Sequence, residues 1–443
     1  MTDDRPSDRV LAAWADVSAR SVARPVVRRV PVRPRRRGWA EVGLLTIAAI
    51  AIAVVGVRVI LDRRTGPATT PSSSPGRTSA VTVAPSGPPS TTPALSPSPV
   101  PSAAPTGRRA GDIQAGRLVT AVDGWALYNG GLLLTHDGGR SWNASAPAAP
   151  PSERVVGAAF ADGSHGWVVG DLVPAEGGSG TLHVNVHRTD DGGTTWETVP
   201  LAAIPSPGPD PLVGFPTFSV LSADDAWILL YVARDQGASS LLYATHDGGR
   251  SWHRQATLIE TQAFSFTDPS NGWAIRGDTN VLLRTRDGGR TWASQRLPTI
   301  TGLAPADLYP NLPIRLADGR LMLFEAAARD GDRGVFLTSE DGGSSWAVAA
   351  RSPAGIAADV AVAADGTWIL GGSPIQASHD DGTTWVAVDT GLPGTIGSLV
   401  VVDGTHVSGL VAVPACGPNA DCYVPHELWI SDDAGLTWRN ATP

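Results

Sequence analysis

The chain has 443 residues, of which 42% are hydrophobic, with 50 Gly, 37 Pro and 15 Trp and a formal net charge of −8. This composition is unusual for a helical enzyme and is typical of a turn-rich β protein. Residues 1–64 hold 13 Arg and 6 acidic residues, or +7, whereas the remaining 379 hold 21 Arg and 36 acidic residues, or −15. Because a strongly acidic region repels phosphate backbones, this charge argues against nucleic-acid binding.

The first 61 residues predict a membrane anchor. Residues 42–61 form an apolar run whose single charge is Arg58, and a helix of this length spans roughly 30 Å, the thickness of a bilayer core. Ten Arg precede the run, and only Arg63 and Arg64 follow it directly, which places the N-terminus in the cytoplasm. We therefore expect a basic cytoplasmic tail (1–41), one transmembrane helix (42–61) and a plasma-membrane protein with its bulk outside. The alternative, a cleaved signal peptide, fits poorly because the run begins 41 residues in and lacks a small-x-small site.

Residues 62–110 predict a stalk. Positions 65–110 contain 11 Pro and 17 Ser or Thr in 46 residues. Such a segment cannot bury apolar surface and favours an extended, polyproline-like state. Fully extended, it reaches roughly 140 Å at about 3.1 Å per residue. A stalk of this length would lift the rest of the chain away from the membrane.

One pattern, S/T-x-D-x-G-x-x-W, recurs along the rest of the chain at intervals of 39 to 56 residues. A motif repeated at such intervals indicates a radially repeated structure. The copies are Thr135 to Trp142, Thr189 to Trp196, Thr245 to Trp252, Thr285 to Trp292, Ser339 to Trp346, Ser378 to Trp385 and Ser431 to Trp438.

Each repeat reads as four short strands. Upstream of every copy lies a turn containing Asp, after which an apolar strand begins, five times with Trp. In the second repeat the strands are expected at about 154–161, 166–171, 181–189 and 194–201, since runs of this length and period-2 pattern suit strands. The 333 residues from 111 to 443 divide into seven units of about 48 residues. The sequence therefore predicts an all-β domain, a seven-bladed β-propeller of four-stranded antiparallel blades.

The motif residues are expected to have structural roles. The carboxylate can accept backbone N–H bonds within the turn, and Gly supplies the positive φ that the reversal needs. The motif Trp is expected to pack between neighbouring blades. The sixth and seventh copies carry Asp381 and Ala434 at a variable position. The motif aspartates are Asp137, Asp191, Asp247, Asp287, Asp341, Asp380 and Asp433.

This motif resembles the Asp box, or bacterial neuraminidase repeat. The stretches 160–171 and 188–196, and the related stretch Phe264 to Ala274, look most similar to photosystem II assembly and stability factor propellers and their relatives in non-photosynthetic bacteria. Sialidases and sortilin-type receptors are more distantly similar. The resemblance covers residues 111–443, and it implies scaffolding or assembly of another envelope protein. We expect a monomeric, non-catalytic binding or assembly scaffold for an envelope protein or glycan, without a cofactor.

The long connections are expected on one face of the propeller. The motif turns and the short turns between first and second strands share one end, which we call the motif face. Insertions at 143–154, 171–182, 201–215, 295–312 and 411–427 collect at the opposite end, which we call the loop-rich face. Variable loops on a rigid scaffold favour binding. The candidate binding residues there are Arg234, Tyr309, Arg329, Arg333, Tyr423 and His426.

The alternative function is that of a surface exo-sialidase-like glycoside hydrolase. By resemblance, such enzymes need an Arg-Ile-Pro element, two further arginines that bind a carboxylate, a Tyr–Glu nucleophile pair and an Asp acid/base. The nearest element in this chain, Arg117-Leu-Val, lacks the Pro. No Tyr–Glu pair can be assigned from the five tyrosines, so no catalytic residue is predicted.

The two cysteines, Cys416 and Cys422, bracket Gly-Pro-Asn-Ala-Asp within one expected loop. Outside the membrane, such a pair predicts a disulfide that ties a loop tip, in preference to a metal site. We expect no bound metal.

Overall fold

The computed structural model describes residues 113–128, 130–147, 154–170, 173–174, 181–202, 204–205, 212–213, 216–234, 237–277, 281–327, 333–353, 359–363, 365–413 and 425–443, all within one compact unit. Among these residues no helix is long and apolar enough to cross a bilayer. The predicted tail (1–41), membrane span (42–61), stalk (62–110) and disulfide Cys416–Cys422 lie outside the described residues.

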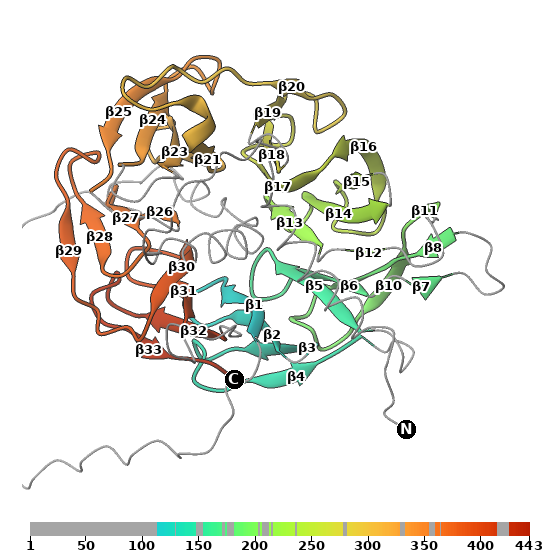
Figure 1. The fold of residues 1–443 in the computed structure, drawn as a ribbon. Coiled ribbons are helices and arrows are strands. Elements are labelled where there is room, and N and C mark those ends of the chain that lie inside the picture. Colours follow the sequence, from blue (N-terminus) through green and yellow to red (C-terminus); the bar gives the residue numbers. More distant parts are fainter. Residues whose placement is uncertain are drawn as a thin grey trace, which may run out of the picture. The chain divides into compact units, whose positions relative to one another are not determined.

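The described chain forms sheets arranged around a centre, and each blade is a run of consecutive antiparallel strands (Figure 1). The first four blades contain β1 (Ile113–Leu118), β2 (Gly124–Tyr128), β3 (Gly131–Thr135) and β4 (Asn143–Ser145); β5 (Val155–Phe160), β6 (Gly166–Gly170), β9 (Asn185–Thr189) and β10 (Glu197–Pro200); β13 (Thr217–Val220), β14 (Ala226–Arg234), β15 (Gly237–Thr245) and β16 (His253–Ile259); and β17 (Thr261–Phe266), β18 (Gly272–Arg276), β19 (Val281–Thr285) and β20 (Ala293–Ser294).

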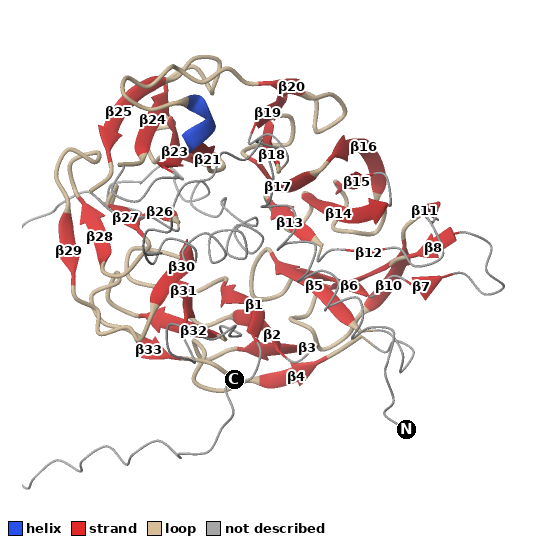
Figure 2. Ribbon diagram, viewed as in Figure 1, coloured by secondary structure: helices blue, strands red, loops and turns tan. Residues whose placement is uncertain are grey.

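The other three blades contain β22 (Ile314–Arg315), β23 (Leu321–Ala327), β24 (Val335–Ser339) and β25 (Ala347–Arg351); β26 (Val360–Val362), β27 (Trp368–Leu370), β28 (Ile375–Ser378) and β29 (Val386–Val388); and β30 (Thr395–Val401), β31 (Val407–Ala412), β32 (His426–Ser431) and β33 (Arg439–Asn440). The all-β, seven-bladed propeller of four-stranded antiparallel blades is thus confirmed. The only helix among the described residues is the short 3-10 helix η1 (Pro305–Asp307) (Figure 2).

The expected loops contain additional short strands. The third strand of blade 2, expected over 181–189, divides at Val184, and its first part, β8 (Thr181–His183), pairs with β7 (Val173–Pro174) and β11 (Ile204–Pro205) in a separate sheet. Two further strands, β12 (Leu212–Val213) and β21 (Leu308–Pro310), add to blades 3 and 5. The connections within 171–182, 201–215 and 295–312 therefore contain short strands, which form a small separate sheet or add to blades 3 and 5.

The largest buried side chains are the Trp residues on the second strand of five of the seven blades. Trp125, Trp167, Trp227, Trp273 and Trp368 are 0–5% exposed. The motif Trp side chains pack against the same interblade clusters but are only partly buried, except Trp346 at 9% exposure. The expectation that the motif Trp packs between neighbouring blades is thus confirmed, and the second-strand Trp occupies the deeper position.

The motif turns share one hydrogen-bond pattern. In the fourth copy the Thr285 hydroxyl donates to Asp287 Oδ1 at 2.8 Å, and the backbone N–H and the hydroxyl of Thr291 donate to the two carboxylate oxygens at 2.9 and 2.6 Å. The Gly289 N–H donates to the Thr285 hydroxyl at 3.0 Å. The other copies repeat these bonds. Each carboxylate therefore holds its turn closed and is fully engaged.

The glycines of these turns also contact the preceding blade. Gly249 of blade 3 has φ +82°, and a Cβ there would overlap the indole of Trp167 in blade 2. Gly343 of blade 5 meets Trp273 of blade 4 in the same way. The Trp167 indole N–H donates to the carbonyl of Gly248 at 3.2 Å. The motif is thus both a turn and a close interblade contact that only Gly permits.

The ring closes between blades 7 and 1 through side-chain packing, without a strand exchanged between them. Leu118, Ile430 and Ala441 form one buried cluster across this joint. The Trp142 indole N–H donates to the Ala441 carbonyl at 2.9 Å, and the Leu118 N–H donates to the Ser408 hydroxyl at 3.2 Å. Figure 1 shows β1 beside β30 to β33, near the C-terminus.

The interblade contact at Gly249 can be separated from backbone strain. Gly366 has a similar φ of +89° but nothing lies within 4 Å of its Cβ position. Both Gly→Ala variants incur about 1–2 kcal/mol of left-handed strain. Gly249→Ala should lose roughly a further 1–3 kcal/mol of unfolding free energy, because the added methyl group overlaps with Trp167. Urea unfolding of the two variants measures this difference, and equal losses would contradict the close interblade contact.

Acid should destabilise the propeller through the motif carboxylates. Hydrogen bonds from the Thr195 hydroxyl, the Thr195 N–H and the Thr189 hydroxyl lower the pKa of Asp191 to about 2, and the pKa of Asp287 is lowered to about 2 in the same way. Since an unfolded Asp has a pKa of about 3.9, the stabilisation is complete above that value and is lost as pH falls towards 2. We expect the free energy of unfolding, measured at pH 5, 3 and 2, to fall less with decreasing pH for Asp287→Asn than for the wild type.

The control for this measurement is Glu340→Gln, which changes an exposed motif residue that does not close the turn. The free energy of unfolding of this variant should fall with decreasing pH by the same amount as that of the wild type. An identical pH dependence of Asp287→Asn, Glu340→Gln and the wild type would show that the turn carboxylates do not cause the acid sensitivity.

Candidate functional site

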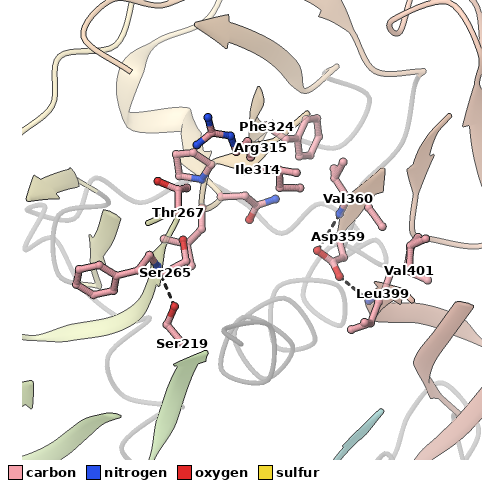
Figure 3. Close-up of a pocket in the computed structure, with 16 residues that line it drawn as sticks. Ser219, Ser265, Thr267, Ile314, Arg315, Phe324, Asp359, Val360, Leu399 and Val401 are labelled. Carbon is pink, nitrogen blue, oxygen red and sulfur yellow. Dashed lines mark hydrogen bonds between the residues drawn. The ribbon is translucent and has the colours of Figure 1, made fainter. Parts of the chain in front are cut away.

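The candidate site is a cavity at the centre of the ring. Its volume is about 130 Å³, and its walls come from the innermost strands of blades 3 to 7 and from the segment that precedes β22 (Figure 3). The lining residues are Ser219, Ser265, Phe266, Thr267, Asn311, Leu312, Pro313, Ile314, Arg315, Phe324, Asp359, Val360, Ala361, Leu399, Val400 and Val401.

Most of the lining is apolar and held in place by interblade packing. The Phe266 ring stacks on Trp227 with centroids 4.0 Å apart and planes at 10°. Phe324 packs against Phe336, with centroids 4.7 Å apart, in the cluster between blades 5 and 6. Because these rings belong to close-packed interblade clusters, the cavity walls are rigid.

Two serines occupy equivalent positions on the inner strands of blades 3 and 4. Ser219 pairs with Trp227, and Ser265 pairs with Trp273. The Ser219 hydroxyl accepts the Phe266 N–H at 2.9 Å and thereby ties the two inner strands together. The Ser265 hydroxyl is buried and has no hydrogen-bond partner. A buried hydroxyl without a partner is a polar group that a ligand in the cavity can satisfy.

Asp359 is the acidic residue of the lining and joins blades 6 and 7. It is 4% exposed. Its carboxylate accepts the Val360 N–H at 2.8 Å and the Leu399 N–H at 2.7 Å, as drawn in Figure 3. Ser398, beside Leu399, has φ +51° within an irregular register of β30. The carboxylate therefore fixes a strained inner strand where it lines the cavity.

Arginines stand on two inner strands. Arg315 on β22 lines the cavity, and Arg117 on β1 faces Trp125 across its strand pair. Arg117 is 8% exposed, and its Cζ lies 5.4 Å from the centroid of the Trp125 ring. Burial lowers the pKa of Arg117 to about 10, so the group stays cationic at neutral pH. The inner wall thus carries positive charge on blades 1 and 5.

Of the six residues predicted from the sequence, the described Tyr309, Arg333 and His426 are not among the residues that line this cavity. Tyr309 lies within β21 and is 37% exposed, Arg333 is exposed before β24, and His426 begins β32. Arg234 ends β14, while Arg329 and Tyr423 lie outside the described residues. Three expected loop residues therefore belong to strands, and the described ones are spread over blades 3, 5 and 7.

The cavity residues that the sequence analysis missed lie on the first strand of each repeat. Ser219 and Ser265 pair with Trp227 and Trp273, the second residues of β14 and β18, and Arg315 pairs with Leu321, the first residue of β23. That register was a usable signal, because aligning the repeats on the upstream turn would have placed these three at one level of the channel.

The lining offers binding groups and little catalytic chemistry. Within the described segments, no cluster of three or more His, Cys, Asp or Glu side chains is placed to hold a metal. The Asp359 carboxylate already accepts two backbone N–H groups. Glycoside hydrolysis uses a pair of carboxylates about 5–9.5 Å apart, one of them free to exchange a proton. The arrangement therefore suits recognition by an apolar wall with a few hydrogen-bonding groups.

Comparisons with known proteins find similar solved structures but no matching family: no protein-family model matches the chain, and no curated protein matches it. Among solved structures, YCF48 from Cyanidioschyzon merolae is 20% identical, with 68% of this chain and 90% of that chain covered and a TM-score of 0.41. A structure of YCF48 bound to D1 peptide is 19% identical, with 66% and 83% covered and a TM-score of 0.40.

Glycoside hydrolases also appear among the similar structures. The GH93 α-L-arabinofuranosidase of Fusarium graminearum in complex with arabinobiose is 12% identical, with 71% of this chain and 91% of that chain covered and a TM-score of 0.40. The similar structures thus include YCF48, in one case with a bound peptide, and a glycosidase, and they do not decide between binding and catalysis.

Removing the Asp359 carboxylate should loosen the cavity wall. Asp359→Ala leaves two backbone N–H groups without their charged acceptor, which should cost about 2–4 kcal/mol of unfolding free energy. Asp359→Asn keeps one acceptor oxygen and should cost about half as much. Chemical denaturation measures both losses, and a loss below about 0.5 kcal/mol for Asp359→Ala would contradict this role.

Proposed function

We propose that this chain is a non-catalytic binding or assembly scaffold that holds an envelope protein or glycan at the central cavity of its propeller. In this proposal, residues 42–61 anchor the chain in the plasma membrane, and the stalk 62–110 displays a monomeric propeller outside. The observation that carries the proposal is a rigid, mostly apolar cavity with the buried, partnerless hydroxyl of Ser265.

Two features favour binding over catalysis. The carboxylate in the lining, Asp359, is engaged in holding β30 and is therefore poorly placed for proton transfer. The motif carboxylates are fully engaged in their turns, and their depressed pKa values keep them ionised above about pH 4. A general acid needs a proton to give at neutral pH. These carboxylates hold none.

The test is site-specific photo-crosslinking in the native envelope with the full-length protein. A benzophenone amino acid replaces Val400 in the cavity or, as a control, Val386, which is 63% exposed on the outer strand β29. The cavity position should give a discrete crosslinked product that the outer position lacks, because the ligand contacts the channel wall. Equal products from both positions, or none from Val400, would contradict binding at the cavity.

A second measurement tests the catalytic alternative. The purified full-length protein is assayed with fluorogenic sialoside and arabinofuranoside substrates, beside the Asp359→Asn variant. We expect no turnover by either protein. Turnover by the wild type that Asp359→Asn abolishes would replace the scaffold proposal with a glycoside hydrolase.

A further inference from the structure

A second buried acidic group, Glu325, lies close to the cavity but outside it. Glu325 is on β23, where alternate side chains Leu321 and Leu323 face the apolar cluster between blades 4 and 5. It is 4% exposed, and its Oε2 atom has no hydrogen-bond partner. An ionised carboxylate in this position would be costly, since burial of an unpaired charge is strongly unfavourable.

The immediate neighbours of Glu325 are apolar. Pro310 of β21 and Val335 of β24 pair with it on either side. Arg351 on β25 lies beyond Val335 and donates to the Thr301 carbonyl at 3.1 Å. Among the described residues, the other ionisable groups on the elements around it are Arg276, Arg296, Asp307, Tyr309, Arg315 on β22, which pairs with β23, and Arg333. Burial raises the pKa of Glu325 to about 7.

Strand β21 connects Glu325 to the cavity wall. It pairs with β23 over three residues, and the partner of Glu325 is Pro310, which has no N–H to donate. The next residue, Asn311, donates its N–H to the Phe324 carbonyl at 2.8 Å. Asn311, Leu312 and Pro313 then form one wall of the cavity. The segment 308–313 is therefore a weakly paired strand that both covers Glu325 and closes the site.

We propose that Glu325 is a proton-dependent latch: its neutral form lets residues 308–313 close against β23, and its ionisation releases this wall of the cavity. Capture of the partner would then depend on pH, a consequence that rests on the proposed function. The latch itself depends only on the contacts of Glu325 and β21.

The direction of the pH effect follows from linkage. Because the carboxyl binds its proton more tightly when the wall is closed, the closed state is most stable below about pH 4.5 and loses stability as pH rises to about 7. Above that range no further loss is expected. Between pH 5 and 8 the equilibrium for opening of 308–313 should shift towards the open state on the order of 50-fold.

Hydrogen exchange of the full-length protein, read by mass spectrometry and corrected for the intrinsic pH dependence of exchange, measures this opening. Protection of the peptide covering 308–313 should fall between pH 5 and 8 in the wild type. The matched variant Glu325→Gln keeps the size and neutral state of the side chain, so its protection should stay constant. A peptide covering β13, 217–220, serves as the internal reference.

Two outcomes would overturn the latch. One is an equal pH dependence of 308–313 in the wild type and Glu325→Gln. The other is a wild-type protection of 308–313 that changes no more than that of 217–220, a comparison that stands even if the variant does not fold. Neither outcome bears on crosslinking at Val400, so failure of the latch is distinguishable from failure of the scaffold.

Discussion

The fold depends on close contacts between motif turns, such as those at Gly249 and Gly343, and the blade before them. Gly249 and Gly343 combine a left-handed backbone with a surface free of Cβ, against which a Trp of the preceding blade packs directly. The Ser or Thr hydroxyl and the Asp carboxylate close the turn, and the closed turn holds the glycine against the preceding blade. The motif therefore both reverses the chain and fixes the position of neighbouring blades, and its repetition produces the ring.

This contact explains why the central cavity is rigid. Blades registered at their motif turns bring the inner strands together, where Ser219 ties blade 3 to blade 4 and Asp359 ties blade 6 to blade 7. Segment 308–313 is the exception, since it is attached to blade 5 by a short ladder that includes a proline. The site thus combines fixed walls with one weakly held wall. The hydrogen bonds of Ser219 and Asp359 hold the fixed walls, and segment 308–313 is the weakly held one.

The sequence predicts the architecture well because its evidence is local and repeated. A turn motif that recurs with a Trp and a preceding apolar strand leaves few alternatives to a propeller, and the strands of blade 2 lie within a few residues of their predicted bounds, apart from the break at Val184. The conformation of Asp381 and Ala434, at φ 54° and 60°, follows from the same repeat, since they replace a glycine of positive φ.

The site was harder to predict because it is made by residues distant in the chain. Ser265, Arg315 and Asp359 come from three blades, and each looks ordinary within its own strand. Tyr309 and His426 lie in long connections of the sequence, but the structure places them in strands β21 and β32, and neither residue is among those that line the cavity. Glu325 had no sequence signal, because its burial results from packing between blades 4 and 5.

The central claim is that the motif face is structural and that partners bind at the cavity. Hydroxyl-radical footprinting of the full-length protein, in envelope membranes and after purification, reports on the cavity and the motif face in one measurement. Binding should protect Leu312 and Val401 in the cavity while Val122 and Leu436, which are 49% and 63% exposed on the motif face, react equally in both samples. Protection of Val122 and Leu436 with no change in the cavity would contradict the account.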